Sequence, residues 1–242
     1  SAQWGLLPGG TNYLSVRVID NAFSTTTLTN AFFILKDTQP PTAAANVPAY
    51  SSSDTFTVPY TAADSGHAGI NFVKLYYTLQ TASPYTYTLY ITTTINPIQF
   101  TAPSEGRYGF KIIAYDRAGN TDETDPPSSS APPESTTLVD LTAPQVNNQQ
   151  TGDVIWRKEP KSDGYAVYFN DSGSGLDSAQ YIIRSGPGIT DDVLKDWSYI
   201  FQSTNVVSYN KNWQIDFDAC KSSWNYVSVR VWDIAGRTTT VN

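Results

Sequence analysis

The chain has 242 residues, of which 40% are apolar and only 15% are charged. This balance excludes a disordered acidic tail and a coiled coil, and the length is sufficient to bury a core. The net charge is −7 at pH 7 and no basic patch stands out, so we expect no nucleic-acid partner. No apolar run reaches transmembrane length, so we expect no membrane insertion in this segment.

One strand pattern occurs three times along the chain, and each copy ends at an aspartate. The copies are Asn12–Asp20, Tyr108–Asp116 and Asn225–Asp233. Counting back from the aspartate, apolar residues stand at every second position with mainly polar residues between them, which predicts a strand with one buried face. A turn follows, in which Gly119 and Gly236 supply the positive φ that a tight turn requires.

Two shorter patterns also repeat. Asp37–Pro41 (DTQPP) is matched by Asp140–Pro144 (DLTAP), and proline stiffens such a connector. The loop Asp64–Ile70 (DSGHAGI) is matched by Asp171–Leu176 (DSGSGL). The repeats therefore predict three units. Residues 1–38 are the last strands of one domain, residues 39–140 form a complete domain, and residues 141–242 form a third domain. Both ends of the chain are expected to lie inside domains.

The complete unit contains a series of short alternating segments that predict strands. They are Thr55–Ala62, Phe72–Leu79, Tyr85–Thr93, Ile98–Ala102, Arg107–Asp116 and Thr136–Asp140. Short strands separated by turn signals are typical of a β-sandwich, and no long segment has helical periodicity.

Three irregular features accompany these strands. The third unit lacks a final strand after Thr238–Asn242, by comparison with the first unit. It also carries an insertion at residues 186–205, in which Thr190–Trp197 predicts a short capped helix. The Pro/Ser-rich segment 121–135 predicts an exposed mobile loop.

Taken together, the D-x-A-G-N strand end, the D-S-G-x-G-[IL] loop and the D-x-x-P-P junction resemble bacterial Ig-like and fibronectin type III-like repeats. The resemblance implies an all-β fold of tandem immunoglobulin-like β-sandwich domains in an elongated array. It also implies an extracellular or cell-surface location and no shared catalytic residues. Domains of this kind serve as spacers, adhesins, filament subunits or enzyme appendages, so the resemblance defines architecture more closely than function.

The residues that catalysis would need are scarce. His67 is the only histidine, and it stands between Gly66 and Gly69 in a predicted turn, where an exposed loop residue is expected. Cys220 has no second cysteine and no neighbouring histidine to activate it, which indicates an inert thiol. We therefore expect no enzyme and no cofactor, with calcium left open.

Calcium requires several oxygen ligands, which aspartate-rich loops supply. Asp171 with Asp177 is the candidate pair, and 191–192 and 216–218 are further acidic clusters. None has the spacing of an EF-hand loop. A turn-forming role explains Asp64 and Asp171 equally well, because an aspartate side chain caps its own turn.

The third unit is rich in tryptophan, which allows a glycan-binding alternative. Trp197, Tyr199 and Trp213 are the candidate residues for stacking on sugar rings. The other interpretation is that these rings cover the core or a domain junction. Trp232 favours the second interpretation. It stands directly before the repeated aspartate, where the other units have Ile19 and Tyr115, so the position has a structural role in all three.

The final hypothesis concerns assembly. Residues 1–38 carry strands without a complete domain, and we expect this segment to pack on the third unit of another copy. The apolar residues of its predicted edge are Phe32, Phe33, Ile34 and Leu35. The alternative is that the chain is part of a longer polypeptide. We therefore expect a non-catalytic structural component of a surface layer, stalk or filament, whose partners are itself or neighbouring repeats. A carbohydrate-binding or adhesive module with glycan partners is the alternative.

Overall fold

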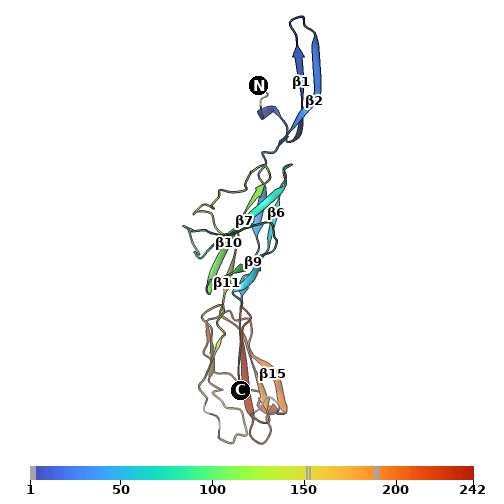
Figure 1. Ribbon diagram of the computed structural model, residues 1–242. Helices are drawn as coiled ribbons and strands as arrows, with labels where there is room; N and C mark the ends of the chain where they lie inside the picture. The colour runs from blue at the N-terminus through green and yellow to red at the C-terminus, as the bar shows by residue number, and fades with distance from the viewer. Residues whose placement is uncertain (1–3, 151, 153, 188–190) are drawn as a thin grey trace. The chain divides into compact units, whose positions relative to one another are not determined.

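The structure, a computed structural model, describes residues 4–150, 152, 154–187 and 191–242 (Figure 1). Two short 3-10 turns, Trp4–Leu6 and Phe217–Ala219, are the only helical elements among these residues, and every other regular element is a β-strand. This agrees with a sequence rich in tyrosine and threonine, whose side chains suit a pleated surface. The all-β class predicted from the sequence is confirmed.

The chain forms two compact units, each built from several chain segments. Unit 1 comprises Ser1–Pro48, Thr57–Phe100 and Arg107–Thr137, and unit 2 comprises Ala49–Phe56, Thr101–Gly106 and Leu138–Asn242. The three-domain boundaries expected from the repeats stay a prediction.

Unit 1 begins with a long antiparallel hairpin of β1 (Gly10–Ile19) and β2 (Thr25–Lys36). Its register pairs Leu14 with Phe32, and a bulge follows Leu14. Asp20 closes the turn, since its carboxylate accepts hydrogen bonds from two backbone N–H groups of the turn at 2.9 and 2.8 Å. The first copy of the repeated strand pattern therefore forms β1, with its aspartate as a turn cap. The buried face predicted for this copy is wrong, because β1 belongs to a two-stranded sheet in which Val16 and Val18 are 45% and 64% exposed.

The middle of the chain forms three small sheets. β3 (Thr42–Ala45) pairs with β6 (Tyr60–Ala63), and β5 (Thr55–Val58) pairs with β9 (Ile98–Thr101). The third sheet has five strands in the order β4 (Tyr50–Ser51), β11 (Ser135–Val139), β10 (Gly106–Asp116), β7 (Ile70–Thr78) and β8 (Thr88–Thr93).

The core of this region is aromatic. Phe100, Tyr108 and Phe110 are fully buried, and the rings of Phe100 and Phe110 meet edge to face with centroids 4.9 Å apart. Leu75 and Ile112, paired across β7 and β10, complete the buried surface. The second copy of the strand pattern thus supplies the apolar face that its period-two alternation predicts.

Unit 2 contains two further sheets. One has three strands, β12 (Gln145–Asn148), β13 (Val167–Asn170) and β16 (Ser208–Tyr209). The other has four strands in the order β15 (Val193–Phe201), β14 (Leu176–Arg184), β17 (Tyr226–Asp233) and β18 (Thr238–Val241).

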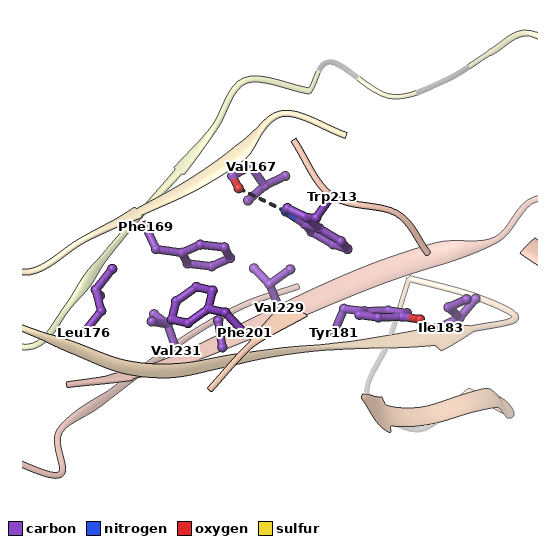
Figure 2. Packing of buried hydrophobic residues seen from close by; sticks show 10 residues of the cluster. Val167, Phe169, Leu176, Tyr181, Ile183, Phe201, Trp213, Val229 and Val231 are labelled. Atoms are coloured by element: carbon purple, nitrogen blue, oxygen red, sulfur yellow. Dashed lines mark hydrogen bonds between the residues drawn. The ribbon is translucent and has the colours of Figure 1, made fainter. Parts of the chain in front are cut away.

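Both sheets of unit 2 contribute to a single buried cluster, which Figure 2 shows from close by. Phe169 of β13 meets Phe201 of β15 edge to face at 5.6 Å between centroids. Trp213 lies over Tyr181 and donates a hydrogen bond from its indole nitrogen to the Val167 carbonyl at 3.0 Å. The indole is therefore a core residue whose single polar group is satisfied.

One expectation for unit 2 is corrected. The predicted helix at Thr190–Trp197 is wrong, because residues from Val193 onward form β15; Thr190 itself lies outside the described residues. Residues four apart share a face in a strand as well as in a helix, so the spacing of Val193 and Trp197 did not distinguish the two. The segment Thr238–Val241 forms β18, which pairs with β17 and places Val241 opposite Val229. The expected lack of a further strand after Thr238–Asn242 stays a prediction.

The Pro/Ser-rich segment 121–135 is attached to the five-stranded sheet through Asp125. Its carboxylate accepts hydrogen bonds from Lys74, Tyr76 and Tyr115. Burial alone would raise the pKa of Asp125, but these three donors outweigh it and hold the pKa below its usual value. Burial and the hydrogen bond to Asp125 in turn raise the pKa of Tyr76 to about 12.

Replacing Asp125 by Asn should lower the free energy of unfolding at pH 7 by about 1–3 kcal/mol, because three bonds lose their charged acceptor. The folded-state pKa is depressed, so this contribution is complete above the unfolded-state pKa and is lost as the pH falls through the folded-state pKa. Guanidinium denaturation over a pH series measures the effect, with the exposed Asp54→Asn as control. A loss that is the same in strong acid would contradict this account.

Candidate functional site

Two clusters of three aspartates form where the three sequence repeats meet. The first cluster, in unit 1, consists of Asp37, Asp64 and Asp116, and the second cluster, in unit 2, consists of Asp140, Asp171 and Asp233. In each cluster the three residues offer carboxylate oxygens that lie within 4.8 Å of one another. The connector, the D-S-G loop and the end of the repeated strand each supply one member.

The connector aspartate of each cluster is bound by backbone N–H groups of the following D-S-G loop. Asp37 accepts bonds from His67 and Ala68, both at 2.6 Å, and Asp140 accepts one from Ser174 at 2.6 Å. Each carboxylate also accepts a bond from the N–H two residues ahead in its own connector. Hydrogen bonds to a charged acceptor are among the stronger ones, so both connectors are fixed at their first residue.

The loop aspartates cap their own turns, as the sequence predicted. Asp64 accepts bonds from the N–H groups of Gly66 and Gly69 at 2.8 and 2.7 Å. Asp171 accepts one from Gly175 at 2.6 Å. A side chain at Gly173 would place its Cβ under 3.0 Å from the carboxylate of Asp140, so glycine is needed for the close approach of the connector.

The strand-end aspartates differ between the clusters. One oxygen of Asp116 accepts the backbone N–H of Asn120 at 2.8 Å, and the other accepts the Asn120 side-chain amide at 2.7 Å. Asp233 accepts the backbone N–H of Arg237 at 2.8 Å through Oδ1, but its buried Oδ2 has no hydrogen-bond partner among the described residues. The side chain of Arg237 instead donates to backbone carbonyls, including that of Asp140 at 3.2 Å.

Burial separates the clusters further. Asp140, Asp171 and Asp233 are all buried, with 2–3% of each residue exposed, whereas Asp37 and Asp64 are partly exposed. Burial, and then the charges of Asp140 and Asp171, raise the pKa of Asp233 to about 6. Burial also raises the pKa of Asp171. In contrast, backbone N–H donors, that of Gln39 foremost, lower the pKa of Asp37.

The structure places the predicted calcium residues apart. Asp171 belongs to the second cluster, while Asp177 lies outside it and accepts a bond from the Ser178 hydroxyl at 2.9 Å. Sequence reasoning missed Asp140 and Asp233 as neighbours of Asp171. The sequence contained a signal for this grouping, because Asp140 begins the repeated connector and Asp233 ends the repeated strand.

The predicted glycan residues occupy three different environments. Trp213 is buried in the core, so its ring offers no face to a sugar. Trp197 is covered on one face by the guanidinium of Arg230, which lies 4.0 Å from its centroid and 4.8 Å from that of Trp232. Tyr199 is the only one of the three that is largely exposed, with 54% of the residue accessible to solvent. It lines an open groove of about 310 Å³ together with Asp177, Ser178, Gln180, Arg230 and Trp232.

His67 and Cys220 occupy the positions expected of them. His67 is exposed, and its backbone N–H rather than its imidazole contacts the first cluster. Cys220 is half-buried, and burial raises the pKa of its thiol, which lowers the thiolate fraction.

The predicted assembly residues lie in β2. Phe32, Phe33 and Leu35 are 50%, 59% and 69% exposed, and Ile34 is half-buried. Both faces of this strand therefore present apolar side chains, which is unusual for a soluble surface.

No protein-family model and no curated protein matches the chain. Among solved structures it is similar to the fibronectin(III)-like modules of CbhA from Clostridium thermocellum, at 15% identity and a TM-score of 0.42, over 83% of this chain and 90% of that one. A tetra-tandem repeat from the extending region of a large adhesion protein gives 14% identity and a TM-score of 0.38. That match covers 96% of this chain and 55% of the other.

The FN1–FN3 domains of chicken CNTN1 give 12% identity and a TM-score of 0.39, over 93% and 74% of the two chains. No helix among the described residues has the length and apolar character to cross a membrane.

A test of the connector geometry is Gly173→Ala. The added Cβ would displace the Asp140 carboxylate from the Ser174 N–H, so we expect unit 2 to lose about 1–3 kcal/mol of unfolding free energy. Chemical denaturation followed by tryptophan fluorescence measures the change. The matched control is Ser172→Ala in the same loop, where the side chain is exposed and the expected change is within about 0.5 kcal/mol. Equal stability of the two variants would contradict the proposed contact.

Proposed function

We propose that the chain is a non-catalytic, extracellular structural repeat segment that belongs to a surface layer, stalk or filament. The observation that supports this most directly is the repeated attachment of the connectors. In both clusters, an aspartate at the start of a Pro-containing connector is bound by the backbone of the next D-S-G loop. A repeat that sets the length of a stalk or bears mechanical load needs rigid connectors. Two independent copies of the same connector attachment therefore favour a structural role.

A hollow in unit 2 agrees with a non-catalytic role. It has a volume of about 710 Å³ and is lined mainly by apolar and aromatic side chains, including Trp156, Val229 and Trp224. Among the described residues that form its walls there is neither a carboxylate side chain nor an imidazole. General acid–base catalysis most often uses such groups within hydrogen-bond reach of a substrate, and the titratable residues Lys158, Lys221 and Cys220 of this lining have none of them as a partner there. The lone His67 lies in unit 1, on an exposed turn.

In the four-stranded sheet β18 is the outer strand beside β17, so a strand from another copy would add to β18. The β1–β2 hairpin offers a contact surface for such an association, since its apolar side chains are exposed on both faces. We propose that this hairpin packs against neighbouring repeats of the same protein or against another copy, and thereby buries Phe32, Phe33 and Leu35. Removal of such apolar area from water drives association.

The structural role is tested by locating the native protein. Immunogold electron microscopy of the source cells should place the chain on a continuous layer, stalk or filament outside the cell. Protease treatment of intact cells should release its peptides. Labelling confined to the cytoplasm would contradict the proposal, as would a purified native complex with enzymatic turnover that depends on this chain.

Glycan binding is the second candidate, and the groove around Tyr199 favours it. An exposed tyrosine ring beside the polar groups of Asp177, Gln180 and Arg230 combines stacking with hydrogen bonding. If a glycan array identifies a ligand, Tyr199→Ala should weaken binding about three- to tenfold, as expected for the loss of one aromatic contact. Tyr13→Ala, an exposed tyrosine of unit 1, is the control. Unchanged affinity of the Tyr199 variant would exclude the groove.

A further inference from the structure

We propose that the second cluster, formed by Asp140, Asp171 and Asp233, binds one divalent cation of the calcium type. The inference concerns the chemistry of this cluster and does not depend on the structural role proposed above.

The spacing of the carboxylates suits a shared cation. Calcium binds carboxylate and carbonyl oxygens at about 2.3–2.6 Å, so two ligand oxygens on opposite sides of one ion are about 5 Å apart. The oxygens that the three aspartates offer all lie within 4.8 Å of one another. One ion can therefore contact all three carboxylates without a rearrangement of the backbone.

A second observation points to a missing ligand. Asp233 is 2% exposed, and its Oδ2 has no hydrogen-bond partner among the described residues. A buried carboxylate oxygen without a partner is costly, and folded proteins normally satisfy such groups with a donor, a water molecule or an ion.

Positive side chains do not compensate the cluster. Arg237 is the nearest candidate, but its guanidinium donates to the backbone carbonyls of Asp140 and Ser52. The ion pairs found among the described residues involve other carboxylates. Up to three negative charges thus share a buried site, and a divalent cation would neutralise most of that charge.

The first cluster provides an internal contrast. At the position of Arg237 it has Asn120, whose side-chain amide donates to the second oxygen of Asp116 at 2.7 Å. Asp37 and Asp64 are also partly exposed, so water reaches their carboxylates. In the first cluster, one side-chain amide and solvent therefore compensate the carboxylates without a cation. We assign the cation site to the second cluster alone.

The ligand set favours calcium over magnesium. Three carboxylates leave room for additional water or carbonyl oxygens in a coordination shell of 6–8, which calcium accepts in irregular geometry. Magnesium demands a near-ideal octahedron at about 2.0–2.1 Å and loses its water reluctantly. Bound calcium would hold together the connector, the D-S-G loop and the end of β17, and would stabilise the folded state in proportion to its concentration over Kd.

The test uses the complete chain, first stripped of metal with a chelator and then titrated with calcium chloride by isothermal calorimetry. We expect one calcium per chain, with a Kd of about 10⁻³ M or tighter, the range of extracellular calcium modules. Saturating calcium should also raise Tm by about 5 °C or more, and magnesium at the same concentration should do less.

Two matched variants localise the site. Asp233→Asn keeps an oxygen for the Arg237 N–H, so it should fold, and it should weaken calcium binding at least tenfold. Asp116→Asn makes the same change in the first cluster and should leave affinity and stoichiometry unchanged. Should Asp233→Asn fail to fold by circular dichroism, terbium luminescence excited through tryptophan in the unmodified chain, with competition by calcium, gives an independent readout.

Three results would overturn the proposal. The first is the absence of heat, Tm shift and terbium luminescence in the unmodified chain. The second is calcium binding that survives Asp233→Asn and is lost in Asp116→Asn, which would place the ion in the first cluster. The third is magnesium binding as tight as that of calcium, which would exclude the calcium class.

Discussion

The contact between a connector aspartate and the backbone of the next D-S-G loop determines much of this structure. Asp140 illustrates it: its carboxylate is buried, accepts the Ser174 N–H at 2.6 Å and lies directly against Gly173. Burying a charged group is favourable only where donors or ions compensate it. This requirement explains why glycine stands in the loop, why the loop aspartate caps its own turn, and why the repeated strand ends at another aspartate beside the connector.

The same constraint gives different results in the two units. In unit 1, Asn120 completes the hydrogen bonding of Asp116, and the cluster is satisfied by protein groups and solvent. In unit 2, arginine replaces that asparagine and turns to backbone carbonyls, which leaves one oxygen of Asp233 unsatisfied. One side chain at this position and the deeper burial of the aspartates in unit 2 therefore separate a purely structural cluster from one suited to a cation. The β-strands around both clusters provide the rigid frame on which these short loops depend.

The sequence predicted the strands well, because alternation of apolar and polar residues has the period of an extended chain. It predicted a buried apolar face correctly for β10 and in part for β17, but not for β1, whose Val16 and Val18 are 45% and 64% exposed. β1, β10 and β17 all arise from the one repeated pattern, and the loop aspartates behave as turn caps. The spacing of Val193 and Trp197 did not distinguish a strand from a helix, and burial of Trp213 depends on contacts with Tyr181 that lie far away in sequence. The grouping of Asp140 and Asp233 with Asp171 also needed the fold, since these residues are 31 and 62 positions from it in the chain.

The central claim, that connector carboxylates hold the following loops through backbone N–H groups, is tested most directly by amide hydrogen exchange measured by NMR. The amides of Ala68 and Ser174 lie outside the strands, in loops where amides normally exchange fast. We predict that both are strongly protected, and that Asp37→Asn and Asp140→Asn each remove protection from their own loop alone. Fast exchange of both amides in the unmodified chain would contradict the account.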